Sequence, residues 1–130
     1  MQEEVKYEVK VVATLTKQDW DNLIVTAFEG GINYWAETTF IPDEALGDTY
    51  SEACAQFMWD TYWDDNDEPL GIEIFDKETK ELLGELTVGK VLETLKNYPD
   101  LSHAIHSETY DAATVDEIVQ RAVLNEIVFG

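Results

Sequence analysis

Residues 59–68 hold the densest group of side chains with functional chemistry, because aromatic residues there run into a series of carboxylates. Carboxylates at alternate positions could bind Ca²⁺, but a calcium-binding loop also needs glycine at its sixth position. Registers that begin at Asp64 or Asp65 both lack that glycine, so we expect no calcium site. The segment is then either a solvent-exposed loop held by its aromatic residues or a contact surface for a basic groove, where carboxylates pair with Arg or Lys.

Other candidate reactive groups are sparse. His103 and His106 are three residues apart and could share a helical face, where a nearby carboxylate would complete a zinc site. The single cysteine, Cys54, is distant in the chain, and an ordinary polar helix explains the two histidines equally well. No serine lies in a nucleophile-elbow pattern, and Gly30-Gly31 lacks the lysine and hydroxyl residue of a phosphate-binding loop. We therefore predict no enzyme, no catalytic residues, no metal and no cofactor.

A second group surrounds the glycine pair in residues 30–36. As local structure, the glycines predict a helix end in the left-handed conformation, followed by a strand with Tyr34 and Trp35 on opposite faces. If Tyr34 faces the core, Trp35 points away from it and needs cover from another element or from a partner. A purely structural role and a ligand pocket lined by Asn33, Tyr34 and Trp35 both stay open.

The charge distribution is the strongest functional signal. Between Lys17 and Lys77 the chain has no Lys or Arg, yet fifteen Asp and Glu residues and all 4 tryptophans fall there. The 130 residues carry a formal net charge of −20, against about 2–8 in magnitude for a typical small domain. Because like charges destabilise a compact body, such a field usually serves solubility, steering or a cationic partner. It argues against binding nucleic acid or an anionic membrane, and in favour of a basic partner.

Hydrophobic periodicity and turn residues predict one compact domain, residues 1–130, of the α+β class. We expect a small antiparallel sheet of about four strands, with helices packed mainly on one side. The expected strands are residues 5–16, 32–41, 70–75 and 81–87, the last two as a hairpin. The expected helices begin after caps at Thr16, Thr87 and Thr114, or cover residues 51–62 and 100–106.

Compartment and assembly follow from a few further features. The first residues show neither the basic nor the apolar region of a signal peptide, and no apolar run approaches the roughly 20 residues that span a bilayer. One cysteine permits no intrachain disulfide, which indicates a reducing compartment. We expect a cytoplasmic protein. The apolar residues 127–129 could pack within the chain or between two chains, so a homodimer stays open.

Two blocks of irregular sequence, residues 23–36 and 115–130, resemble a family of small acidic proteins encoded by bacteriophages and prophages. The common elements are a Gly-Gly-Ile-Asn-Tyr-Trp-like turn and an end like Glu-Ile-Val-Phe-Gly. The resemblance covers both ends of the chain and leaves out the acidic centre. It implies a phage context inside a host bacterial cell and carries no catalytic residues. Because small acidic phage proteins often inhibit host defence, including restriction and CRISPR systems, it also implies an anti-defence role.

The first functional hypothesis is therefore a phage-encoded inhibitor that occupies the basic groove of a host nucleic-acid-binding protein, as a DNA or RNA mimic. Duplex DNA presents one negative charge per about 1.7 Å of axis, and carboxylates on a rigid scaffold can imitate that density. The predicted contact residues are Asp43, Glu44, Asp48, Glu52, Asp60, Trp63, Asp64, Asp65, Asp67 and Glu68.

Two alternatives belong to other classes. One is a small-molecule-binding protein, including a nucleotide-binding one, with its pocket at Asn33, Tyr34 and Trp35, although the net charge of −20 opposes phosphate ligands. The other is an acidic phage accessory or immunity protein whose acidity involves no mimicry of nucleic acid.

Overall fold

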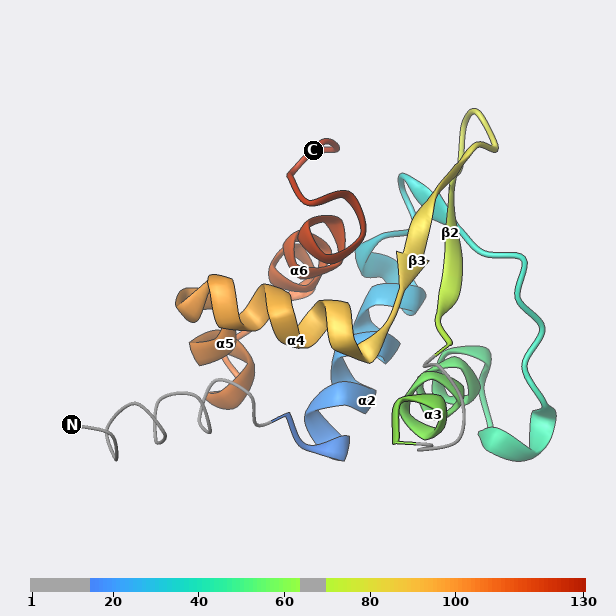
Figure 1. Cartoon of the computed structure of the whole chain (residues 1–130), viewed down its shortest axis with the longest axis horizontal. Coiled ribbons are helices and arrows are strands. Elements are labelled where there is room, and N and C mark those ends of the chain that lie inside the picture. Colours follow the sequence, from blue (N-terminus) through green and yellow to red (C-terminus); the bar gives the residue numbers. More distant parts are fainter. Residues whose placement is uncertain (1–14, 64–69) are drawn as a thin grey trace.

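The computed structural model describes residues 15–63 and 70–130 and shows five α-helices with a three-stranded antiparallel sheet (Figure 1). The predicted α+β class is confirmed. In chain order the elements are α2 (Lys17–Thr26), the π-helix η1 (Ala27–Gly31), β1 (Ala36–Glu37), the 3-10 helix η2 (Glu44–Leu46), α3 (Tyr50–Trp63), β2 (Ile72–Asp76), β3 (Leu82–Leu86), α4 (Val88–Asn97), α5 (Pro99–His106) and α6 (Ala112–Leu124).

The sheet has three strands in the described residues rather than about four. Its order is β1-β2-β3, and the predicted hairpin of β2 and β3 is confirmed by pairing that runs from Ile72 opposite Leu86 to Phe75 opposite Leu82. The expected strand at residues 5–16 lies almost wholly outside the described residues. Gly71 enters the hairpin where no side chain fits, since an added Cβ would lie 2.1 Å from the carbonyl oxygen of Leu86.

The predicted strand at residues 32–41 is wrong in extent, because β1 comprises only Ala36 and Glu37. The preceding residues form turns instead: the backbone N–H groups of Trp35 and Ala36 donate to the carbonyl oxygen of Ile32 at 3.1 and 2.9 Å. These turns use backbone N–H groups that an extended strand would donate to a neighbouring strand. As a result, β1 pairs with β2 over two residues alone.

Helix starts were mostly predictable from single residues. The side chains of Thr16 and Thr87 accept hydrogen bonds from the N–H of the third helical residue at 3.0 and 3.1 Å, as expected for N-caps. The predicted cap at Thr114 is wrong. Asp111 caps α6, and its carboxylate accepts from the Thr114 N–H at 2.9 Å, so the helix begins at Ala112. A carboxylate is a stronger acceptor than a hydroxyl and also favours the positive end of the helix dipole.

The predicted left-handed helix end at the glycine pair is also wrong. Gly30 has non-helical backbone angles, φ 167° and ψ −40°, so the chain kinks there inside the segment η1, and neither glycine adopts the left-handed conformation. Glycine at position 31 instead permits a close approach to α6, because an added Cβ would lie 3.3 Å from the carbonyl oxygen of Ala112.

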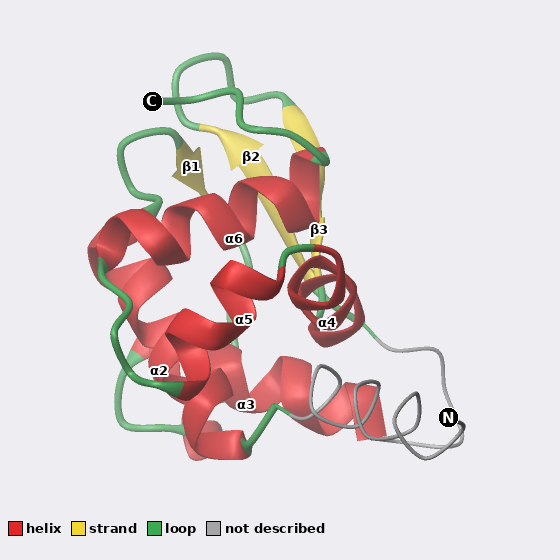
Figure 2. Ribbon diagram, turned by 90° about the vertical axis from the view of Figure 1, so that its left-hand side faces the viewer, coloured by secondary structure: helices red, strands yellow, loops and turns green. Residues whose placement is uncertain are grey.

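The core lies among the helices and the inner face of the hairpin. Helix α6 packs against β3, α4 and η1, and α2 packs against α3 (Figure 2). Trp20 is fully buried between α2 and α3, and its indole N–H donates to the carbonyl oxygen of Ala55 at 2.9 Å. The predicted packing of the helices mainly on one side of the sheet stays a prediction. Within residues 15–63 and 70–130, no helix has the length and apolar character needed to cross a membrane.

Candidate functional site

The acidic face, as we name it here, comprises the exposed carboxylates of η2, of α3 and of the turn between them. Asp43 caps η2 through a 2.9 Å bond from the Ala45 N–H, and Asp60 lies in the second half of α3. The residues of this face are Asp43, Glu44, Asp48, Glu52 and Asp60. Four other predicted contact residues, Asp64, Asp65, Asp67 and Glu68, lie outside the described residues.

The rotation of α3 decides which of its side chains face solvent. Cys54 and Met58, four residues apart, are fully buried, so they orient one stripe of the helix toward the core. Glu52 and Asp60 are exposed on another side, and with the rise of an α-helix they are separated by about 12 Å along its axis. Gln56, between them, donates to the Asp60 carboxylate at 2.7 Å. The helix therefore presents two carboxylates in a fixed register.

The carboxylates of the acidic face take part in none of the ion pairs formed among the described residues. The ion pairs there are Lys17–Asp21, Lys80–Glu37, His106–Asp19 and Arg121–Glu117. Each of these involves a carboxylate on another element. Because these carboxylates form no ion pair with a described cation, the acidic face can attract a positively charged partner.

A polar hollow of about 480 Å³ between α2 and α3 adjoins this face. The carboxylates of Asp21, Glu29 and Glu52 line it, and the Lys17 ammonium lies 2.7 Å from Asp21 at its edge. Ser51 donates to Glu29 at 2.5 Å. The hollow can accommodate a cationic side chain. Sequence analysis missed Asp21 and Glu29 as part of the site, although their spacing of eight residues along one helical face could have indicated it.

An aromatic cluster lies at the end of α3. Trp63, the remaining predicted contact residue, is 61% exposed. Its ring centroid lies 5.0 Å from that of Tyr62 and 5.7 Å from that of Trp59, and Trp59 in turn lies 6.4 Å from the buried Trp20. The contacts form a continuous aromatic path from the core to the surface.

The residues of the second predicted group, Asn33, Tyr34 and Trp35, have two different surroundings. Trp35 is buried and its indole N–H donates to Asp116 at 2.7 Å, whereas Tyr34 is 54% exposed and donates to the other carboxylate oxygen of Asp116 at 2.5 Å. The bond to Asp116 raises the pKa of Tyr34 above its ordinary value. Trp35 is thus covered by another element of the same chain, because Phe129 stacks on it. Tyr34 and Trp35 serve here as links between the β1 turn, α6 and the C-terminal segment.

Asn33 lines a hollow of about 330 Å³ to which Tyr34 and Trp35 do not contribute. Phe28 and Tyr50 form an aromatic wall of this hollow, with ring centroids 6.4 Å apart. Lys77 also lines it and donates to the carbonyl oxygen of Asn33 at 2.8 Å. A small molecule with an apolar ring and an acceptor group would suit these walls.

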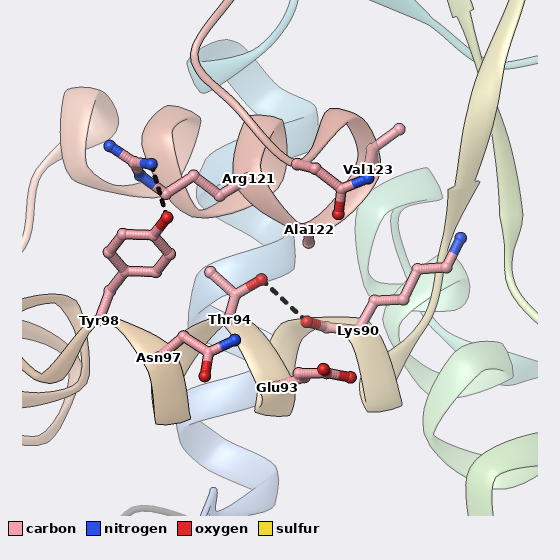
Figure 3. A pocket seen from close by; sticks show the side chains of 9 residues that line it. Lys90, Glu93, Thr94, Asn97, Tyr98, Arg121, Ala122 and Val123 are labelled. Atoms are coloured by element: carbon pink, nitrogen blue, oxygen red, sulfur yellow. Dashed lines mark hydrogen bonds between the residues drawn. The ribbon is translucent and has the colours of Figure 1, made fainter.

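A third hollow, of about 320 Å³, lies between α4 and α6 (Figure 3). Arg121 and Lys90 lie toward its opposite ends. The Arg121 guanidinium is already engaged, because it donates to Tyr98 and to Glu117, each at 3.0 Å. Lys90 donates to the carbonyl oxygen of Glu85 at 2.8 Å. The charge of Arg121 is thus offset by the Glu117 carboxylate, whereas Lys90 is held at the other end by a neutral carbonyl.

The candidate metal and nucleophile residues have ordinary surroundings. His103 and His106 are exposed on α5, and His106 lies 3.7 Å from the Asp19 carboxylate. No group of three or more His, Cys, Asp or Glu gathers in a metal-binding arrangement within the part of the chain that the structure describes. Burial raises the pKa of the Cys54 thiol to about 11, which keeps it protonated and unreactive near neutral pH.

Comparison with models of protein families, with curated proteins and with solved structures gives no match. The resemblance to acidic phage proteins therefore stays a prediction.

Proposed function

We propose that this protein is a phage-encoded inhibitor that acts in the host bacterial cytoplasm, where it occupies the basic groove of a nucleic-acid-binding defence protein. One observation carries the proposal: the carboxylates of the acidic face are exposed on ordered elements and pair with no cation among the described residues. The net charge of −20 supplies a long-range field of the same sign as nucleic acid.

Inhibition would occur by competition for the groove. Carboxylates held on α3 and η2 take the positions of phosphates and pair with arginine and lysine side chains that otherwise contact nucleic acid. Opposite charges accelerate encounter, and salt weakens it, because the Debye length is only about 8 Å at physiological ionic strength. A homodimer would present two such faces and lengthen the imitated strand.

The first experiment is a pulldown from host lysate at low salt, followed by elution with a salt gradient. We expect a basic nucleic-acid-binding protein that elutes as salt rises and is displaced by DNA or RNA. If displacement by nucleic acid fails although a partner binds, the groove is not the contact and mimicry is wrong. Recovery of no protein would direct attention to small-molecule binding.

Charge-matched variants then locate the contact. One variant carries Asp43→Asn, Glu52→Gln and Asp60→Asn on the acidic face, and the control carries Glu78→Gln, Glu93→Gln and Glu126→Gln elsewhere. Both remove three negative charges from −20, so a difference between them reports position and not net charge. We expect that only the acidic-face variant binds the partner more weakly than the parent protein does, and that its binding depends less on salt concentration. Equal losses would mean that the overall field, and not the acidic face, determines binding, and the proposed function would fail.

The hollow beside Asn33 supports a second candidate, a small-molecule-binding protein, because an aromatic wall and Lys77 face one space of about 330 Å³. A Tyr50→Ala variant would then lose a ligand that co-purifies with the parent. If neither a partner nor a ligand is found, the remaining candidate is an acidic accessory or immunity protein without mimicry.

A further inference from the structure

The aromatic cluster at the end of α3 rests on the core through Trp59 and Tyr62 and ends in an exposed ring, that of Trp63. Trp63 is 61% exposed, yet its position is well defined by contacts with two neighbours. Tyr62 meets it edge-on, with an interplanar angle of 89°, and Trp59 is tilted at 60°. Tyr62 itself lies near α4, where a Cβ added at Gly89 would be 3.6 Å from its ring. The indole is therefore held in place before any partner binds.

A carboxylate of the acidic face, that of Asp60, belongs to the helical turn that precedes this indole. Asp60 precedes Trp63 by three residues, and side chains at that spacing are neighbours on a helix surface. The Asp60 carboxylate is oriented by the 2.7 Å bond from Gln56. An ordered aromatic ring and an ordered carboxylate thus share one exposed side of α3.

We propose that Trp63 and Asp60 form an arginine-binding site, so that the basic partner contacts this protein through arginine in preference to lysine. The inference rests on the proposed function and names the chemistry of the partner at this point of contact. A guanidinium is planar and weakly hydrated, so it can stack on the indole while donating two parallel hydrogen bonds to a carboxylate. A lysine ammonium is a compact, strongly hydrated charge that gains less from the indole.

Charge complementarity selects a basic partner for this site over a second copy of the same chain. The chain has a single arginine, Arg121, and its guanidinium is engaged by Glu117 and Tyr98. A second copy would also add a net charge of −20 against the acidic face. The arginine must therefore come from another protein, in agreement with the basic groove already proposed.

The test compares labelled oligoarginine and oligolysine peptides of equal length, with affinities measured by fluorescence anisotropy at about 0.15 M salt. For the parent protein we expect a preference of roughly two- to fivefold for oligoarginine. Trp63→Ala should bring the ratio of the two affinities close to one, mainly by lowering the affinity for oligoarginine. Trp63→Phe, which keeps an aromatic face, should retain part of the preference.

Ile41→Ala is the control, because Ile41 is an exposed apolar residue outside the cluster and its loss should leave the ratio unchanged. Equal affinities of the parent for the two peptides, or a ratio that persists in Trp63→Ala, would overturn the arginine site. Neither result would contradict the proposed function, which is tested by a different variant. The triple variant of the acidic face should lose affinity for both peptides if the proposed function is right. If that variant binds both peptides as tightly as its charge-matched control, the proposed function fails instead.

Discussion

The indole of Trp35 and the phenyl ring of Phe129 stack with centroids 4.9 Å apart and planes only 8° from parallel. This contact joins residues 23–36 to residues 115–130, the two blocks of irregular sequence at either end of the chain. Asp116 strengthens the junction by accepting from Trp35 and Tyr34. The unusual residue types in both blocks therefore have a structural explanation: they hold the C-terminal segment against the body.

Replacing Phe129 with alanine should expose Trp35 and lower the free energy of unfolding by about 2 kcal/mol, because both stacking and apolar burial are lost. Urea unfolding measures the stability, and a red shift of tryptophan emission reports the exposure. Val128→Ala is the matched control, since Val128 is exposed and its removal should change neither quantity. An unshifted emission spectrum for Phe129→Ala would show that another element covers Trp35.

Gln120 should be the most sensitive polar residue of α6. Its buried amide oxygen accepts from the backbone N–H groups of Val128 and Phe129, both at 2.8 Å, and its amide nitrogen donates to the Phe129 carbonyl at 3.0 Å. Gln120→Leu removes these partners, and we expect a loss of about 2 kcal/mol. Proteolysis should also release the C-terminal residues earlier than in the parent.

Gln56→Leu provides the comparison for Gln120, because it removes a glutamine whose bond to Asp60 lies on the surface. Its stability should change by less than about 0.5 kcal/mol. If both glutamine variants lose equal stability, the link between Gln120 and the C-terminal segment contributes nothing specific.

The cap of α6 predicts a defined effect of pH. Hydrogen bonds from the backbone N–H and hydroxyl of Thr114 lower the pKa of Asp111 below its ordinary value. A carboxyl whose pKa is lower in the folded state stabilises the protein above the unfolded pKa of about 3.9, and this contribution is lost as pH falls through the folded value. Asp111→Asn can still cap the helix, so its deficit relative to the parent should be largest near neutral pH and shrink in acid.

Thermal unfolding of parent and Asp111→Asn, measured from neutral pH down to acid, checks this prediction. The difference in stability between the two proteins at each pH cancels the contributions of all other carboxylates, because both proteins share them. Glu126→Gln removes one exposed negative charge without removing a cap, and its difference from the parent controls for net charge. A deficit of Asp111→Asn that grows as pH falls would contradict the assigned direction.

Salt should stabilise the folded protein. With a net charge of −20, the compact state carries self-repulsion that ions screen, as the Debye length falls from about 30 Å at 0.01 M to about 8 Å at 0.15 M. We expect the Tm to rise over this range. The two triple variants described above should both show a smaller rise, because each carries less charge. A Tm that falls with salt would mean that attractive ion pairs outweigh the repulsion.

Much of the fold could be predicted from residues close together in the chain. The caps at Thr16 and Thr87, the buried stripe of α2 and the hairpin of β2 and β3 all depend on interactions within a few residues. The cap of α6 was missed because Asp111 and Thr114 both suit an N-cap, and the choice between them depended on acceptor strength. The exposed carboxylates of α3 were also predictable, since charged side chains rarely stay buried without a partner.

The orientation of Tyr34 and Trp35 required the tertiary structure. Alternation along a strand could not predict it, because turns replace most of the expected strand. Phe129 is far away in the chain, yet it decides that Trp35 lies inside. In the same way, the carboxylates of Asp21 and Glu52 share one hollow only because α2 packs against α3. Amino-acid sequence thus determined the helices, the hairpin and the sign of the surface, since these follow from local bonds and composition. Tertiary packing alone decided which aromatic rings are buried and which acids meet, because burial of large apolar area outweighs local preference.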